Sequence, residues 1–305
     1  MKVFVTGATG FVGQEIVRRL CEAGYSMRFL AHSPGGNIAR EFVSRYGAEA
    51  KHGNVLDVSS LDDALGGTDA VIHLVGIISE IGENTFENVH TRGTQNVLAA
   101  AQRAGVRRFV HMSALGTRPD AVSRYHKSKW AAEEAVRNGG VDYTIFRPSL
   151  IYGRKDHFVN LFAKIIRWSL VVPVMGRSDA KFQPVPVEAV AASFVKSLSE
   201  EKAIGKTFDL CGVETLTMPS LIDQILEVMR RRRLKLRVPA AVAKGQAALL
   251  EFVFPRLLRK AAPLNRDQLI MLNEDNVGNG NPARELFGLK SIHFSEGIAR
   301  YLGKP

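Results

Sequence analysis

A glycine-rich turn near the start of the chain constrains the fold more than any other feature of the sequence. Residues 6–13 read TGATGFVG, with a glycine at every third position. The apolar stretch Lys2–Val5 precedes the turn and predicts a strand buried on both faces of a parallel sheet. Residues 14–23 follow with apolar side chains at helical spacing and predict an amphipathic helix. The glycines therefore belong to a strand-to-helix turn.

Turns of this kind bind the pyrophosphate of a dinucleotide. The missing Cβ lets backbone N–H groups approach a phosphate, and the helix N-terminus adds a partial positive charge. The next segment, SMRFLAH at residues 26–32, predicts a second strand and completes a βαβ unit. The predicted cofactor-binding residues of the turn are Gly7, Thr9, Gly10, Phe11, Val12 and Gly13. A glycine turn with a purely structural role is the alternative.

Strands and helices continue to alternate through the first half of the chain. Predicted strands cover residues 48–57, 69–76 and 107–116, and a predicted helix covers residues 88–105. The third strand is expected to end at Asn54–Val55. This alternation predicts an α/β protein built on a parallel sheet.

Ligands in such sheets lie beyond the carboxyl ends of the strands. This rule selects one shell of candidate residues: His32, Ser33, Asn54, Val55, Leu74, Val75, Gly76, Met112, Ser113 and Ala114. His73 and His111 are expected to be ordinary strand residues, because their spacing matches no metal motif. No metal site is predicted.

Tyr125 and Lys129 lie four residues apart on a predicted helix that follows the fifth strand. That spacing puts both side chains on one helix face. An ammonium beside a phenol favours the phenolate, so we expect Tyr125 to exchange a proton with a substrate oxygen near pH 7.

Four motifs together resemble the short-chain dehydrogenase/reductase superfamily, near its extended, epimerase/dehydratase-like branch. TGATGFVG, HMSALG, YHKSK and RPSLIYG occur in the family's order within residues 1–190. FRPSLIYGRKDHFVNLFAKI and QPVPVEAVAASF resemble an atypical group. That group contains the nucleotide-binding accessory subunit of respiratory complex I and proteins linked to ubiquinone biosynthesis. The resemblance implies a doubly wound Rossmann core over residues 1–150, with residues 151–305 completing the sheet and forming a smaller carboxyl-terminal lobe.

The resemblance also implies roles for single residues. Carried over by position, Asn54 and Val55 lie near adenine and Leu74 to Gly76 near a ribose, while Lys129, Pro148 and Ile151 lie on the nicotinamide side. The implied catalytic set is Tyr125, Lys129 and Ser113. Extended enzymes usually place a serine or threonine where this chain has Ala114, so Ser113 stands one position early. Two functions therefore remain open. One is an oxidoreductase, or a related isomerase, acting on a hydrophobic carbonyl or quinone-like substrate. The other is a non-catalytic accessory or assembly protein of a respiratory or quinone-related membrane complex, whose cofactor is structural.

The end of the second strand bears on cofactor choice. NAD sites usually carry an acid there, which binds the ribose 2′-OH. This chain has no acid between that strand and Glu41, whereas His32, Ser33 and Arg40 can receive a 2′-phosphate. We predict NADP(H) in preference to NAD(H), the alternative being an open loop that accepts either.

Basic residues are concentrated in the second half of the chain. The net charge is +11, and residues 1–150 carry 17 basic and 15 acidic side chains against 24 and 15 in residues 151–305. The run RRRRLKLR, Arg230–Arg237, predicts a peripheral contact with an anionic membrane or a membrane complex. A solvated helix end followed by a basic strand is the alternative. No nucleic-acid motif accompanies the run, which argues against nucleic acid as a partner.

Composition predicts a cytoplasmic protein, placed at the inner face of a membrane if the basic run binds lipid. The apolar content is 46%, no apolar run approaches the length of a membrane span, and Met1 leads directly into the first strand, which leaves no room for a signal peptide. Cys21 and Cys211 are too few for a disulfide framework. The apolar segment at residues 157–176 is expected either to pack the lobe or to line a pocket for an apolar substrate.

Overall fold

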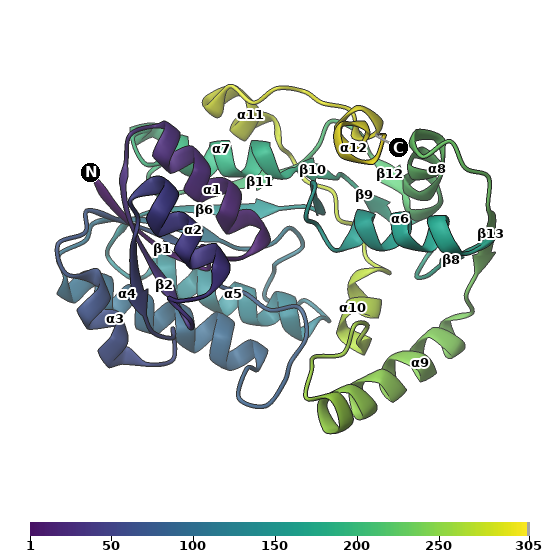
Figure 1. Ribbon diagram of the computed structural model, residues 1–305, viewed down its shortest axis with the longest axis horizontal. Helices are drawn as coiled ribbons and strands as arrows, with labels where there is room; N and C mark the ends of the chain where they lie inside the picture. The colour runs from purple at the N-terminus through teal and green to yellow at the C-terminus, as the bar shows by residue number, and fades with distance from the viewer. Residues whose placement is uncertain (304–305) are drawn as a thin grey trace.

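Seven parallel strands form the centre of the molecule in the computed structural model, which describes residues 1–303. Their order is β11-β6-β5-β4-β1-β2-β3 (Figure 1). The strands are β1 (Lys2–Thr6), β2 (Ser26–Ala31), β3 (Glu49–His52), β4 (Ala70–His73), β5 (Arg108–Met112), β6 (Asp142–Pro148) and β11 (Lys206–Leu210). The strand order reverses between β1 and β4, so their carboxyl ends mark the point where such sheets bind ligands. The predicted doubly wound fold is confirmed.

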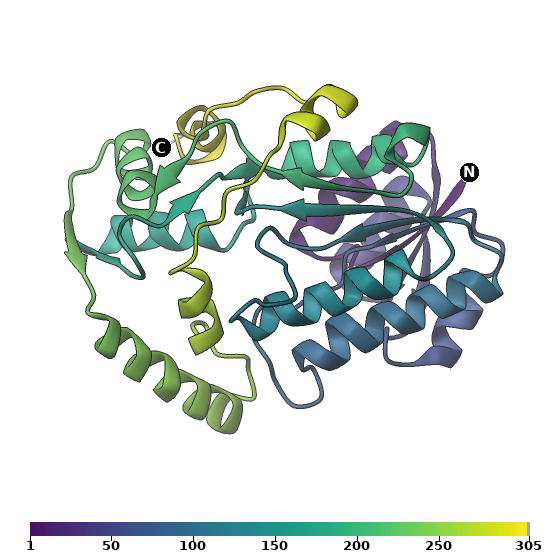
Figure 2. The same cartoon turned by 180° about the vertical axis from the view of Figure 1, so that it is seen from behind.

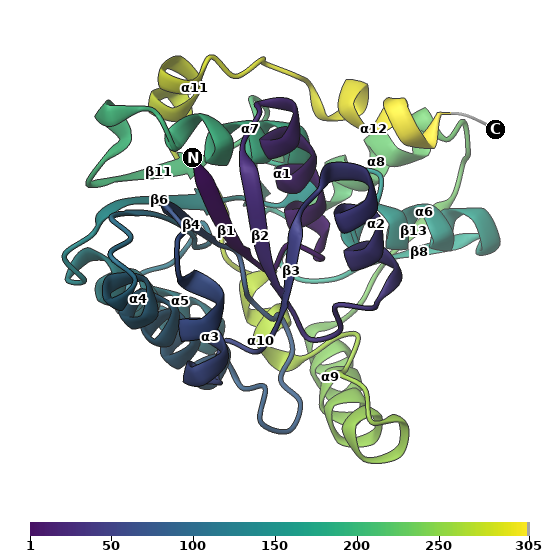
Figure 3. The same cartoon turned by 60° about the vertical axis from the view of Figure 1, so that its left-hand side comes forward.

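Helices cover both faces of this sheet, as the view along its edge shows (Figure 3). One layer holds α1 (Phe11–Glu22), α2 (Asn37–Tyr46) and α7 (Val187–Ser197), and the other holds α3 (Val58–Leu65), α4 (Gly93–Arg103) and α5 (Arg124–Arg137). Strand β1 shows why both layers are needed, because Val3 and Val5 join one core and Phe4 joins the other. A strand buried on both faces is apolar at every position.

Several strands are shorter than the sequence predicted. The expectation that the third strand reaches Asn54–Val55 is wrong, because β3 ends at His52. Beyond it, the Gly53 N–H donates to Ala31 O, and the Asn54 N–H donates to the Ser60 hydroxyl oxygen at 3.2 Å. The strands predicted over residues 69–76 and 107–116 also end early, at His73 in β4 and at Met112 in β5. The loops that carry the candidate site follow them. The helix predicted over 88–105 begins as a π-helix, η1 (Glu87–Arg92), and continues as α4.

A smaller lobe lies at the carboxyl side of the sheet (Figure 1). Its helices are α6 (Phe158–Trp168), α8 (Met218–Val228) and α12 (Phe294–Leu302). Its strand pairs are β7 (Ile151–Tyr152) with β10 (Val185–Pro186), β8 (Val171–Val174) with β13 (Leu234–Arg237), and β9 (Lys181–Phe182) with β12 (Leu216–Thr217). Val159, Phe162 and Ile166 of α6 are buried against α8 in a separate core. The apolar segment at 157–176 therefore packs the lobe through these residues.

The last part of the chain runs between lobe and sheet (Figure 2). A short 3-10 helix, η2 (Glu201–Ala203), precedes β11. After β13 the chain forms α9 (Ala240–Val253), a π-helix η3 (Phe254–Leu258), α10 (Arg266–Met271) and α11 (Asn281–Phe287). Helix α11 returns to the first core, where Phe287 contacts Phe146 and Phe208. Within residues 1–303, every helix is too short or too polar to cross a membrane.

Candidate functional site

Two of the three motif glycines shape the turn between β1 and α1. Gly7 adopts φ +73°, and a Cβ at this position would lie 3.1 Å from the backbone of Leu74 and Val75. A Cβ on Gly13 would lie 2.2 Å from Gly7 O, so a side chain there would push α1 off the turn. These glycines hold the turn against both the start of α1 and the loop after β4.

Gly10 has a different role, because a Cβ there would meet only Gly7 O, at 3.2 Å. It is the exposed N-cap residue of α1, and no side chain caps this helix within the described chain. The N–H groups of the first turn, at Phe11 and Val12, are therefore available to an anion, as phosphate binding at a helix N-terminus requires. Thr9 is fixed beside them because Gln14 Nε2 donates to its carbonyl at 3.0 Å. The turn fits a pyrophosphate.

The loops after β2 and β3 lie next along the same sheet edge. His32 and Ser33 are exposed, and α2 begins four residues after Ser33 without a side-chain cap. The Arg40 guanidinium, one turn into α2, donates to Asn37 Oδ1 at 2.6 Å. Val55 is buried, and its carbonyl accepts from Asn96 Nδ2 at 3.0 Å. No acidic side chain occurs between residues 26 and 40, which leaves this edge open to a phosphate.

A buried hydrogen-bond chain fixes His73 as a neutral strand residue. The Thr94 hydroxyl donates to His90 O at 2.5 Å, so Thr94 Oγ1 accepts from His73 Nε2–H at 3.0 Å. His73 Nδ1 in turn accepts from the Thr6 hydroxyl at 2.6 Å. Burial lowers the pKa of His73 to about 3, with Lys129 contributing. Among residues 1–303, no three side chains of the metal-ligating types converge on one point.

His90 links the loop after β4 to the helix of Tyr125, and no motif in the sequence indicates this role. Its Nε2 accepts from the Ile77 N–H at 2.9 Å, so the proton sits on Nδ1 and is donated to Ser128 Oγ at 2.8 Å. The Ser128 hydroxyl then donates to Tyr125 O, also at 2.8 Å. His90 lies in the π-helix η1, and such bulges frequently occur at functional sites.

Lys129 is buried where helix α5, the carboxyl end of β5 and the loop after β4 meet. Its Nζ donates to Met112 O at 3.0 Å, and a Cβ added to Gly76 would lie 3.1 Å from that Nζ. Burial lowers the pKa of Lys129 to about 8, against the opposing attraction of Glu133. The structure thus brings together the carboxyl end of β5, the loop after β4 and helix α5.

Tyr125 has a neutral phenol near pH 7, so the expectation that Lys129 favours its phenolate is wrong. Burial, followed by the charge of Asp267, raises the pKa of Tyr125 to about 12. Its ring packs edge-on against His90 and Phe86, with centroids 5.2 and 5.8 Å away. A phenol in this state donates a proton instead of accepting one.

Ser113 is directed into the buried layer. Its hydroxyl donates to Thr117 Oγ1 at 3.4 Å, and its N–H pairs with Phe146 O at 2.8 Å. Ala114 occupies the next, half-buried position and has no hydroxyl. Pro148 ends β6 and accepts from the Leu115 N–H at 2.9 Å, and Ile151 lies half-buried in β7.

Two residues of the carboxyl-terminal segment also reach the site, more than 100 residues from their partners. The Asp267 carboxylate of α10 accepts from Ser123 Oγ and the Arg124 N–H, both at 2.8 Å, and from the Tyr125 N–H at 3.1 Å. The side chain of Asn276 accepts from Ser149 Oγ at 2.5 Å and donates to Leu115 O at 3.0 Å. Sequence spacing carries no signal for contacts of this kind.

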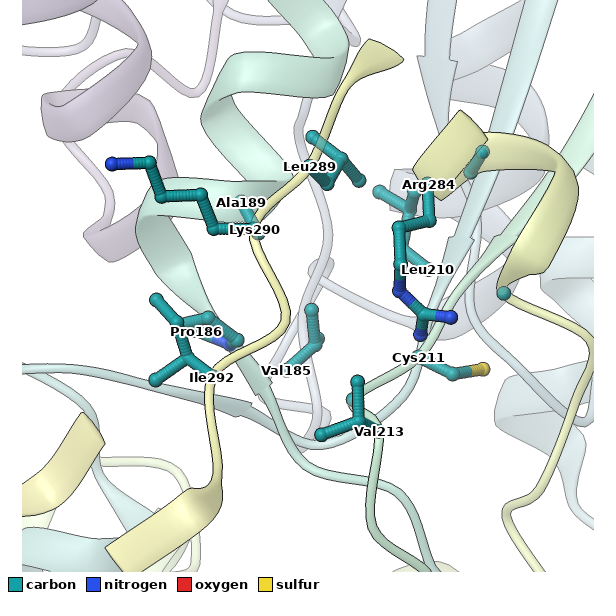
Figure 4. Close-up of a pocket in the computed structure, with 13 residues that line it drawn as sticks. Val185, Pro186, Ala189, Leu210, Cys211, Val213, Arg284, Leu289, Lys290 and Ile292 are labelled. Carbon is teal, nitrogen blue, oxygen red and sulfur yellow. The ribbon is translucent and has the colours of Figure 1, made fainter. Parts of the chain in front are cut away.

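Two small hollows lie elsewhere. One, drawn in Figure 4, has a volume of about 20 Å³ and lies between β10, β11 and α11, where Cys211, Arg284 and Lys290 line it. The other, of about 100 Å³, lies between Tyr152, Glu188 and Arg300. The first has room for about one water molecule, and neither includes a residue of the glycine turn.

Comparisons with known proteins agree with this geometry. Residues 7–162, just over half of the chain, match a family described as NAD(P)H-binding. The chain is 28% identical over 291 residues to the mitochondrial NADH dehydrogenase (ubiquinone) 1 alpha subcomplex subunit 9 of Arabidopsis thaliana, covering 91% of this chain and 71% of that protein. It is 28% identical over 320 positions to the sterol demethylase protein B of Methylococcus capsulatus, covering 95% and 93%.

A solved structure of UDP-glucose 4-epimerase from Thermotoga maritima has the same fold. The TM-score is 0.76 at 19% identity, and the match covers 99% of this chain and 98% of that one. This likeness confirms the predicted fold, while the family match and the NADH dehydrogenase relative confirm the predicted resemblance to dinucleotide-binding proteins.

Proposed function

Because the chain belongs to the NAD(P)H-binding family, with the fold of its epimerase-like structural neighbours, we propose that it is an NADP(H)-dependent oxidoreductase acting on a hydrophobic carbonyl or quinone-like substrate. The observation that carries this proposal is the placement of Tyr125, whose phenol is neutral, one turn of α5 before the buried Lys129, whose Nζ donates to Met112 O at the carboxyl end of β5. The sterol named in one relative supports an apolar substrate class.

The proposed chemistry divides between cofactor and protein. When bound, a reduced nicotinamide would supply the hydride for the substrate carbonyl carbon. Tyr125 donates its phenolic proton to the carbonyl oxygen, whose negative charge develops as the hydride arrives. Lys129 lies beside Gly76 and Met112, where it can hold the nicotinamide ribose. The turn at Gly7 to Gly13 binds the pyrophosphate.

Turnover of the Tyr125→Phe variant tests this proposal. We expect hydride transfer from NADPH to apolar ketones and quinones to fall about 100-fold or more, the usual contribution of a placed acid. NADPH binding should persist, because the pyrophosphate contacts do not involve the phenol. Equal, negligible turnover by wild type and Tyr125→Phe would reject the proposal that the protein is an enzyme.

A second candidate function is an accessory protein in which the cofactor stabilises the fold. Ala114 favours it, because this residue cannot donate a hydrogen bond to a developing oxyanion and such a donor is typically worth about 3–4 kcal/mol. The name of the Arabidopsis thaliana relative, a subunit of NADH dehydrogenase, also favours it. In this case NADPH would raise the unfolding temperature without being consumed.

The preference for NADP(H) over NAD(H) rests on the loop after β2. His32 and Ser33 are exposed there with Arg40 one helical turn further on, and the acid that binds a 2′-OH is missing. Fluorescence titration should show tighter binding of NADPH than of NADH. His32→Asp should reverse the order, and Gly10→Val should abolish both. Equal wild-type affinities would contradict the preference.

We further propose that the protein is cytoplasmic and contacts the inner face of a membrane through Arg230–Arg237. The run forms the turn after α8 and strand β13, as the alternative interpretation expected. Lys235 pairs with Asp223, and Arg233 donates to Ile166 O. Among residues 1–303, the other arginines of the run form no ion pair, so their charge remains available to anionic lipid.

A further inference from the structure

Helix α9 and the π-helix η3 lie at the margin of the molecule (Figures 1 and 2). They expose several apolar side chains. The exposed fractions are 62% for Leu249, 59% for Phe252, 76% for Leu257 and 53% for Leu258. We call these four residues, with Arg256, Arg259 and Lys260, the α9–η3 tip. On its other side α9 buries only Ala243 and Ala247, which pack against Leu269 of α10.

The segment of chain that contains the tip is almost entirely basic. Residues 230–263 contain ten lysines and arginines and a single acid, Glu251. Glu251 is already paired with Arg266 at 2.6 Å. The Arg256 guanidinium lies over the Phe252 ring at 4.1 Å, which keeps its charge beside the apolar surface. This charge distribution complements a surface rich in anionic groups.

We propose that the α9–η3 tip inserts into the surface of an anionic lipid bilayer. Leucine and phenylalanine side chains gain free energy on entering the acyl region, while arginine and lysine reach up to the phosphates. Strand β13 places Leu234 and Leu236, both exposed, among the basic residues at the start of the same segment. Apolar side chains interspersed along the chain with basic ones fit lipid headgroups over acyl chains. The inference deepens the membrane contact proposed above and names its inserting element.

Vesicle co-sedimentation of the full chain separates insertion from electrostatic attraction. The probe is phosphatidylcholine vesicles with and without phosphatidylglycerol. Leu257→Gln with Leu258→Gln should lower partitioning into the anionic vesicles about tenfold or more, and should do so at high salt too. The matched control, Val43→Gln with Val58→Gln, changes two exposed apolar residues on α2 and α3 and should have no effect. Unchanged NADPH binding shows that each variant is folded.

A direct readout of depth compares Phe252→Trp in a Trp168→Phe background with the Trp168→Phe protein itself, so that the emission of Trp130 cancels. Brominated acyl chains should quench the fluorescence of the introduced tryptophan in anionic vesicles and leave it unchanged in neutral ones. If the double leucine variant binds as well as wild type, and the Phe252→Trp protein shows no quenching, the proposal that the tip inserts is overturned. If Arg230–Arg233→Gln then abolishes binding, the proposed contact of the basic run stands alone. If wild type binds neither vesicle, both proposals fail.

Discussion

At the scale of single residues, Lys129 is the group whose protonation most depends on folding. Its pKa lies at about 8 in the structure, below the ordinary lysine value of 10.5, because its ammonium is buried. Between these two pH values the unfolded chain holds the proton and the folded chain does not. Stability contributed by this group therefore rises as pH increases from about 8 to about 10.5. Below pH 8 the buried charge costs about 3 kcal/mol.

Lys129→Met should remove that pH dependence in the cofactor-free protein. We expect the free energy of unfolding of the variant minus that of wild type to be largest at pH 7. This difference should decline by up to about 3 kcal/mol toward pH 10.5, because wild type gains stability over that range. The raised pKa of Cys211 gives an opposite slope above pH 9, but it is common to both proteins and cancels in the difference. Urea titrations across this range measure it. Lys127→Met, an exposed change on the same helix, is the control. A constant difference would show that Lys129 stays charged.

At the scale of elements, α10 fixes the beginning of α5 from a distant part of the chain. Asp267 receives three hydrogen bonds from Ser123, Arg124 and Tyr125, and its negative charge stands at the N-terminus of α5. Anions are stabilised at that end of a helix. The same charge contributes to the raised pKa of Tyr125. Helix α10 packs on α9 through Leu269, so it connects the α9–η3 tip to the helix of the candidate acid.

Asp267→Asn should therefore have two effects. Losing the charge should destabilise the protein by about 1–2 kcal/mol, in the range of a helix cap. It should also lower the pKa of Tyr125, which the ultraviolet absorbance of tyrosinate reports by difference from Tyr125→Phe. Glu251→Gln breaks the ion pair to the neighbouring Arg266 without touching α5, and should change neither. An unaltered tyrosine titration would mean that Asp267 fixes the position of the start of α5 without affecting the pKa of Tyr125.

At the scale of the whole molecule, the sequence predicted the sheet and the glycine turn because their signals are local. The apolar run of β1, the glycine spacing and the helical pattern of α1 lie within 22 residues. The parts that sequence reasoning missed depend on contacts between distant segments. His90 acts through Ile77 and Ser128, and Asp267 through α5, and neither has a characteristic spacing. The protonation state of Tyr125 was missed because burial and the charge of Asp267 raise its pKa, and neither is visible in a Tyr-x-x-x-Lys motif.

The two halves of the chain are interleaved in space, since α7, β11 and α11 all come from beyond residue 150 and pack on the sheet. Phe287 of α11 is buried, with its ring 5.5 Å from Phe146 and 5.3 Å from Phe208. We therefore expect the protein to unfold in one transition, and Phe287→Ala to lower its free energy of unfolding by about 3–5 kcal/mol. Phe252→Ala removes a ring of the same size from the exposed α9–η3 tip and should cost little. Calorimetry with and without NADPH shows whether the protein unfolds in one transition or in two. If Phe287→Ala produces two separate transitions with NADPH still bound, the sheet and the lobe are independent units and α11 only links them.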